Sequence, residues 1–194
     1  MNLSNLFLQV MNDNPPEAIA VLSGNSDAPA LAGKVFFYAL PIPGVLILAE
    51  VSGLPDQDSP IGSHFFAMHS HEFGDCTLPF DKTGMHYNPG NQPHPEHAGD
   101  LLPLMSSRGY AWAAFFDERF TIREILGRSV ILHLHRDDFT TQPSGDAGEK
   151  IGCGKIRKYA APGQLQPDQR QPGQLQPDQF QPGRGKHQIP YSMF

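Results

Sequence analysis

Short apolar runs, each about the length of one β-strand, alternate along the chain with clusters of turn-forming residues. Asn25 to Pro29 and Pro41 to Gly44 are two such clusters, and the chain holds 19 glycines and 19 prolines. Short strands at this spacing are typical of antiparallel β-sandwiches and barrels. We therefore predict an all-β fold. The runs that we expect to form strands lie at 18–23, 31–40, 45–54, 65–71, 110–116, 121–125 and 129–135.

Composition divides the chain into three segments. A length of 194 residues suits one domain with a real core, which we assign to residues 17–158. Residues 1–16 are polar and end in Asn-Pro-Pro, which predicts an extended or flexible lead-in. Residues 159–194 carry a ten-residue Pro/Gln repeat that begins at Pro162 and recurs at Pro172. Such a segment cannot offset about 1–2 kcal/mol of backbone entropy per residue, so we expect a disordered tail, either a spacer or a weak binding segment.

Charge and hydropathy exclude some classes of partner. A formal charge of -6 provides no basic footprint for nucleic acid or for an anionic membrane surface. The longest apolar runs, such as 44–49, are much shorter than the roughly 20 residues of a membrane span. The first basic residue is Lys34, so the given N-terminus does not resemble a secretory signal. We expect a cytoplasmic protein if the N-terminus is complete, and a periplasmic or extracellular one if a signal has been removed.

One long segment, residues 74–103, is dense in Gly, Pro, Asn and Asp and shows no periodic pattern. A loop of this length inside a compact domain is usually functional or disordered. Eight of the nine histidines of the chain lie between His64 and His135, around and inside this loop. Its own ligand-competent side chains favour a functional loop, and they are His86, His94, His97 and Asp100.

Two pairs of histidines have the two-residue spacing of one strand face. His69 and His71 form the first pair, and His133 and His135 form the second. Residues i and i+2 of a strand point to the same side, so both rings of a pair can reach one metal ion. Imidazole and carboxylate ligands suit zinc and copper. The pattern predicts one metal ion and is compatible with a second.

The sequence pattern does not indicate that the two remaining histidines or the two cysteines are metal ligands. A single histidine is more often a surface or packed residue than a ligand, and we keep that interpretation for His64 and His187. Cys76 and Cys153 lie far apart and fit neither a CxxC redox motif nor a zinc ribbon. The two cysteines could form one disulfide or remain inert thiols.

Four motifs follow one another along the predicted domain at consistent spacings. They are HSHEFGDC from His69, MHYNP from Met85, GRSVILH from Gly127 and DAGEKIGCG from Asp146. In this order they resemble the copper/zinc superoxide dismutase family, with the shortened zinc loop of its bacterial members. The resemblance runs from about residue 17 to residue 158. It implies a Greek-key antiparallel β-sandwich, or flattened eight-stranded barrel, with long metal-binding loops.

The resemblance also implies two metal sites that share one histidine. Copper would be bound by His69, His71, His86 and His133. Zinc would be bound by His86, His94, His97 and Asp100. Asp137 would link a zinc-ligand histidine to a copper-ligand one and fix their ring orientation. Its four-residue offset selects His133 over His135 as the copper ligand, and Cys76 and Cys153 would form the disulfide of the family.

The implied activity is the disproportionation of superoxide with copper and zinc as cofactors. His86 would carry a proton to the product, and Lys150 would attract the substrate anion. The family usually has an arginine at the position of Lys150, and lysine keeps the charge but loses the planar fork. Phe66 and Ala67 replace a His-Gly pair that is common in the family, and 134–149 is a short version of its charged guiding loop. A homodimer is compatible with the resemblance.

Two other functions compete with the enzyme. The first is a non-catalytic domain of the same family that binds zinc or copper for buffering or delivery. Such relatives typically lack one or more copper histidines, whereas this chain has all four. The second is a β-sandwich adhesion or matrix module with an incidental histidine patch, which only the Pro/Gln tail favours.

Overall fold

The computed structural model describes residues 2–56, 58–59 and 61–161. The described residues up to Tyr159 form one compact unit. Nearly all of the tail predicted at 159–194, including its repeats, lies outside the described residues. The elements of this unit are α1 (Leu3–Asp13), β1 (Ala18–Gly24), β2 (Ala32–Ala39), β3 (Val45–Ser52), β4 (Phe65–Phe66), β5 (Met68–His71), the 3-10 turn η1 (Asp81–Thr83), β6 (Leu104–Met105), β7 (Ala111–Asp117), α2 (Ile122–Ile125), β8 (Ser129–His133) and β9 (Lys150–Lys158).

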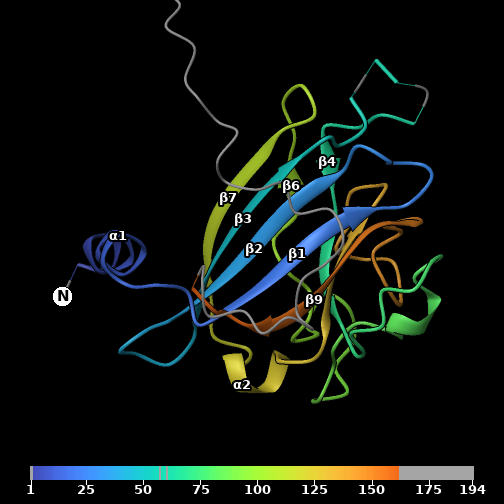
Figure 1. Ribbon diagram of the computed structural model, residues 1–194. Helices are drawn as coiled ribbons and strands as arrows, with labels where there is room; N and C mark the ends of the chain where they lie inside the picture. Colours follow the sequence, from blue (N-terminus) through green and yellow to red (C-terminus); the bar gives the residue numbers. More distant parts are fainter. Residues whose placement is uncertain (1, 57, 60, 162–194) are drawn as a thin grey trace, which may run out of the picture. The chain divides into compact units, whose positions relative to one another are not determined.

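Seven strands form one antiparallel sheet in the order β5-β8-β9-β1-β2-β3-β7, and β4 pairs with β6 in a two-stranded sheet. The long strands β1, β2, β3 and β7 lie side by side (Figure 1). β8 pairs with both β5 and β9, and β3 pairs with β7, so strands distant in sequence become neighbours. The predicted all-β antiparallel fold is confirmed.

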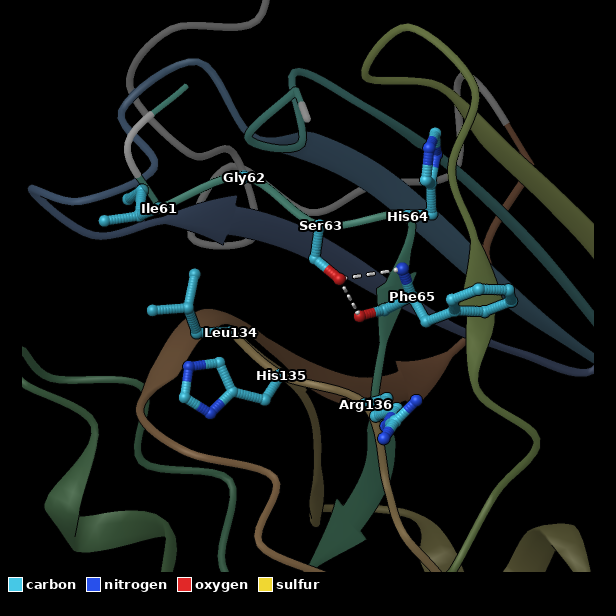
Figure 2. Close-up of a pocket in the computed structure, with 8 residues that line it drawn as sticks. All are labelled: Ile61, Gly62, Ser63, His64, Phe65, Leu134, His135 and Arg136. Atoms are coloured by element: carbon cyan, nitrogen blue, oxygen red, sulfur yellow. Dashed lines mark hydrogen bonds between the residues drawn. The ribbon is translucent and has the colours of Figure 1, made fainter. Parts of the chain in front are cut away.

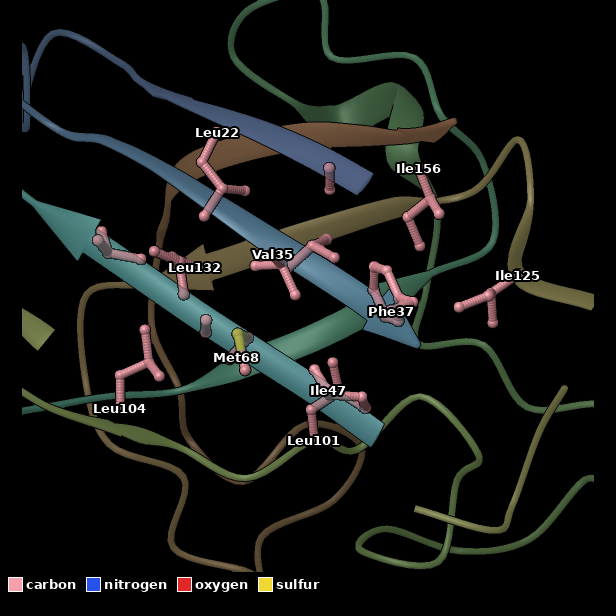
Figure 3. Packing of buried hydrophobic residues seen from close by; sticks show 14 of the residues in the cluster. Leu22, Val35, Phe37, Ile47, Met68, Leu101, Leu104, Ile125, Leu132 and Ile156 are labelled. Atoms are coloured by element: carbon pink, nitrogen blue, oxygen red, sulfur yellow. The ribbon is translucent and has the colours of Figure 1, made fainter. Parts of the chain in front are cut away.

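Alternating side chains of the sheet form one hydrophobic core. Val35 and Phe37 of β2 point inward together with Ile47 of β3, and they pack near Met68 and Leu132 (Figure 3). All five side chains are fully buried. Burial of a side chain of this size contributes about 1.5–3 kcal/mol. The core therefore packs against β5 and β8 through Met68 and Leu132. These two strands carry three of the histidines of the predicted metal sites.

The prediction of an extended or flexible lead-in at 1–16 is wrong, because Leu3–Asp13 forms the helix α1. The side chain of Asn2 caps its first turn by accepting a hydrogen bond from the backbone of Ser4 at 3.0 Å. Val10 is buried against the outer face of the sheet, and the ring of Phe7 stacks on Phe116 with centroids 5.7 Å apart. The composition is polar, but its apolar residues recur at helical spacing.

Two other predictions of local structure need correction. The run 121–125 is a short helix, α2, because Thr121 and Glu124 form a capping box that starts a helical turn. β9 was not among the predicted runs. Gly152 and Gly154 interrupt its apolar pattern, and its position between β1 and β8 supplies the pairing that makes it a strand.

Candidate metal centre

Two antiparallel strands and one loop bring the first group of histidines together. His69 and His71 lie on β5, and His133 ends the neighbouring strand β8. His86 reaches them from the long loop through a β-bridge to His71. One ligand atom from each of these four buried histidines lies within 4.8 Å of the others. The structure thus brings together the residues that the resemblance assigned to copper.

Backbone carbonyl groups orient two of these rings. Nδ1 of His71 donates to the carbonyl oxygen of Gly84 at 2.9 Å, and Nδ1 of His133 donates to that of Gly148 at 3.0 Å. A carbonyl oxygen can only accept, so in each ring Nδ1 carries the hydrogen and Nε2 keeps its lone pair. The two Nε2 atoms lie 3.4 Å apart. Both lone pairs are therefore available at one point between the strands.

A second buried group surrounds Asp100 in the long loop. Nδ1 of His86 lies 2.7 Å from Oδ1 of Asp100, and Nδ1 of His94 and of His97 lie 3.0 Å and 3.2 Å from Oδ2. Ligand atoms of these four residues also lie within 4.8 Å of one another. His86 belongs to both groups. We refer to the first group as the four-histidine cluster and to the second as the aspartate cluster.

The ring nitrogens that lack partners show that the clusters fit metal ions. Among the described residues, His69 Nδ1, His86 Nε2 and His94 Nδ1 are buried without a hydrogen bond, although His94 Nδ1 approaches Asp100. Buried polar atoms are rarely left unsatisfied. Imidazole nitrogens with one carboxylate form a donor set that suits copper and zinc.

Asp137 connects the two clusters from behind. Its Oδ2 accepts a hydrogen bond from Nε2 of His69 at 2.9 Å, and its Oδ1 accepts one from Nε2 of His94 at 2.8 Å. The carboxylate is buried, as are both rings. With Nε2 held in this way, each ring presents Nδ1 to its cluster. The position matches the linking role that the resemblance implied for Asp137.

Burial favours the uncharged form of three rings of the four-histidine cluster, those of His69, His71 and His133. It lowers the pKa of His69 and His71 well below 6.5, and it lowers the pKa of His133 to about 4. The positive charge of neighbouring groups adds to this effect, including that of Lys150 beside His71 and His133. Neutral imidazole is the form that binds a metal ion, so these rings are ready to act as ligands at neutral pH.

The loop is attached to β5 by a network of backbone hydrogen bonds. Ser70 N donates to Gly99 O, Gly99 N to Tyr87 O, and Tyr87 N to Ser70 O, each at 2.8 Å. A Cβ atom at Gly99 would overlap the backbone of Ser70 and Tyr87, so the approach requires glycine. This network fixes the loop on both sides of the histidines and sets His86 between β5 and Asp100.

Sequence reasoning missed two side chains that hold the aspartate cluster. Arg119 donates to the carbonyl oxygens of His97 and Asp100 and is itself paired with Asp117. Gln142 accepts from His94 N at 3.0 Å and donates to His94 O at 2.6 Å. Both act on backbone atoms of the loop, and no spacing in the sequence marks them.

Lys150 begins β9 opposite His133. Its ammonium nitrogen lies 2.9 Å from Oγ1 of Thr83, 3.2 Å from the carbonyl oxygen of Gly84 and 3.4 Å from that of Phe80. The side chain is half-buried, and burial lowers its pKa. Its charge therefore lies beside the four-histidine cluster and against the turn that precedes His86.

Comparisons with known proteins agree with this geometry. Residues 31–156 match the family model described as copper/zinc superoxide dismutase. The chain belongs to the copper/zinc superoxide dismutase family. Superoxide dismutase [Cu-Zn] A of Xenopus laevis is 31% identical over 155 residues, which cover 72% of this chain and 96% of that protein. A crystal structure of the clock protein EA4 aligns with a TM-score of 0.63 and 28% identity, covering 75% of this chain and 96% of that one.

A longer relative in the same family is extracellular superoxide dismutase [Cu-Zn] of Mus musculus. It is 34% identical over 138 residues, which cover 66% of this chain. The chain spans about half the length of this protein and of its Rattus norvegicus counterpart, 53% and 55% respectively.

The disulfide that the family resemblance implied is confirmed. Cys76 of the long loop is bonded to Cys153 of β9, with Cα atoms 5.7 Å apart. Cys153 packs with Phe80 and Ile131 in a small apolar cluster. The bond ties the start of the metal-binding loop to the strand that carries Lys150.

His64 and His135 belong to neither metal cluster of the described residues. Both line a separate pocket of about 580 Å³ with Ser63 and Leu134 (Figure 2). Ala67 lies between β4 and β5, and its backbone N–H donates to the carbonyl oxygen of His135 at 2.8 Å. His187 lies outside the described residues.

Neither helix in the described part of the chain is long and apolar enough to cross a membrane.

Proposed function

We propose that this chain disproportionates superoxide to dioxygen and hydrogen peroxide. In this proposal the four-histidine cluster holds copper and the aspartate cluster holds zinc. The observation that carries it is the position of His86, whose Nδ1 faces Asp100 while its Nε2 is buried without a partner. One ring can therefore belong to two adjoining metal sites, and membership of the family supports this use of the geometry.

A bound copper ion would supply the one-electron oxidation and reduction that convert two superoxide ions and two protons to the products. The chain supplies positions for the protons and the substrate. Whenever Nε2 of His86 does not act as a ligand, it would be available to hold a proton for the product, because no group of the protein occupies it, while Asp100 at Nδ1 keeps the ring in place. Lys150 would attract the anionic substrate toward the same region.

The experiment combines elemental analysis with a superoxide-consumption assay on the full chain after loading with copper and zinc. We expect both metals to bind and turnover to depend on copper. His133→Ala should lose copper binding and turnover but retain zinc, because His133 lies outside the aspartate cluster. His135→Ala is the matched control, two residues further along and in neither cluster, and should behave as the unchanged chain.

Metal binding without copper-dependent turnover would contradict the proposal. That outcome would favour the non-catalytic alternative, in which the same clusters buffer or deliver a metal. Equal effects of His133→Ala and His135→Ala would contradict the assignment of His133 as a copper ligand.

A further inference from the structure

The hydrogen bonds of Lys150 account for its whole donor capacity. An ammonium group carries three hydrogens and no acceptor. Three acceptors surround this one, namely Oγ1 of Thr83, the carbonyl oxygen of Gly84 and that of Phe80, at 2.9–3.4 Å. All three belong to the segment that contains η1 and ends two residues before His86. The ammonium therefore has no hydrogen left over for a ligand while these contacts persist.

Thr83 makes the shortest of the three contacts and is fixed in its orientation. Its side chain is 0% exposed, and its hydroxyl donates to the carbonyl oxygen of Phe80 at 2.7 Å. With its hydrogen engaged, the hydroxyl oxygen can only accept from Lys150. A buried acceptor of this kind would be costly to leave unmatched, so Thr83 holds the ammonium against the turn.

We propose that Thr83 is a positioning residue that restrains Lys150, so that Lys150 acts on the anionic substrate as a charge and not as a hydrogen-bond donor. This inference rests on the proposed superoxide dismutase function. A guanidinium at the same position has five N–H donors. It could satisfy the same acceptors and still donate to an anion, whereas the lysine cannot.

The hydrogen bonds that restrain Lys150 also involve a residue that contacts the four-histidine cluster. The carbonyl oxygen of Gly84 accepts from Lys150 at 3.2 Å and from Nδ1 of His71 at 2.9 Å. The ammonium thus lies one shared acceptor away from a ring of the proposed copper site. An anion that is drawn to Lys150 consequently approaches the region between His71 and His133.

The test measures the binding of inorganic phosphate, as a probe anion, to the metal-loaded full chain by calorimetry. Thr83→Val keeps the shape of the side chain but removes the acceptor, which frees one N–H of Lys150. We expect phosphate to bind about threefold more tightly or better, because the freed N–H can donate a charge-assisted hydrogen bond to the anion. Lys150→Arg should produce a gain of similar size and also raise kcat/KM for superoxide.

Three further variants show whether the effect passes through Lys150. Thr83→Ser restores the acceptor and should return phosphate affinity to its original value. Thr77→Val, an exposed threonine of the same loop, should not produce the gain. In a Lys150→Met background, Thr83→Val should have no effect on phosphate binding, because the group that it releases is absent.

Unchanged phosphate affinity in folded Thr83→Val, or an equal gain in the Lys150→Met background, would overturn the inference. If Thr83→Val does not fold, Lys150→Arg decides, and unchanged affinity there also overturns it. Phosphate binding is measured without superoxide. A chain that shows these affinities but no copper-dependent turnover would therefore contradict the proposed function and not the role of Thr83.

Discussion

Asp137 accepts one hydrogen bond from each of two histidines that belong to different clusters. Oδ2 holds His69, and Oδ1 holds His94. Both rings are thereby turned so that Nδ1 faces the ligand position. A residue that binds no metal itself in this arrangement can set the affinity of two sites, because it fixes the tautomer and the orientation of a ligand in each.

Replacing Asp137 with asparagine tests that coupling. An amide has one oxygen acceptor, so at most one ring keeps its bond, and the amide hydrogens oppose the N–H of the other. We expect affinity to fall about 10- to 100-fold for at least one of the two metals, measured by competition with a chelator. Asp138→Asn is the control, since that neighbouring carboxylate bonds only to Thr140 and Thr141 among the described residues. Equal affinities in the two variants would refute the coupling.

The residues of the site differ in how far sequence could identify them. His69, His71 and His133 were predictable because strand periodicity and motif order place them on adjoining faces. Arg119 and Thr83 were not. Arg119 donates to backbone carbonyl oxygens of the loop, and Thr83 accepts from the side chain of Lys150. These contacts form only when the loop folds, so they leave no regular spacing in the sequence.

At the scale of elements, strands were predicted better than helices. The runs at 18–23, 31–40 and 45–54 correspond to β1, β2 and β3, because two-residue alternation over a core is a strong signal. The overall polar composition of residues 1–16 favoured a flexible segment, whereas the helical spacing of the few apolar residues in α1 is the signal that indicates a helix. The apolar face of α1 packs on side chains of the outer surface of the sheet, such as Tyr38 and Leu46. That surface exists only once the strands have paired, so the sequence of α1 alone does not reveal it.

Phe7→Ala tests whether α1 stabilises the sheet. The ring of Phe7 is partly buried and stacks on Phe116, so its removal should destabilise the chain by about 1–3 kcal/mol, less than the loss for a fully buried phenylalanine. The measurement is the free energy of unfolding in urea. Leu8→Ala on the opposite side, where the side chain is 55% exposed, should change it by less than about 0.5 kcal/mol. A loss no larger for Phe7→Ala than for Leu8→Ala would mean that the contact adds little.

At the scale of the whole molecule, the metal-binding loop is fixed at several separated points. Cys76 is bonded to Cys153, and Arg119 and Gln142 hold the segment that carries the aspartate cluster. The loop lies against β5 and β8, where burial lowers the pKa of His69, His71 and His133. The stability of the metal-free chain should therefore depend on whether those histidines remain neutral, which makes global unfolding a measure of the site.

We expect the metal-free chain to lose stability as pH falls from about 6.5 toward 4. In the folded chain burial holds the pKa of His133 at about 4 and lowers that of His69 and His71, whereas the unfolded chain takes up protons near 6.5. The unfolded state then binds more protons, so stability is fully present above pH 6.5 and declines below it, by about 1.4 kcal/mol per pH unit for each histidine that stays neutral. Urea unfolding of the chelator-treated chain at several pH values measures this slope. His133→Gln should reduce the slope, and stability that is constant or rises toward pH 4 would show that the buried rings accept protons without unfolding.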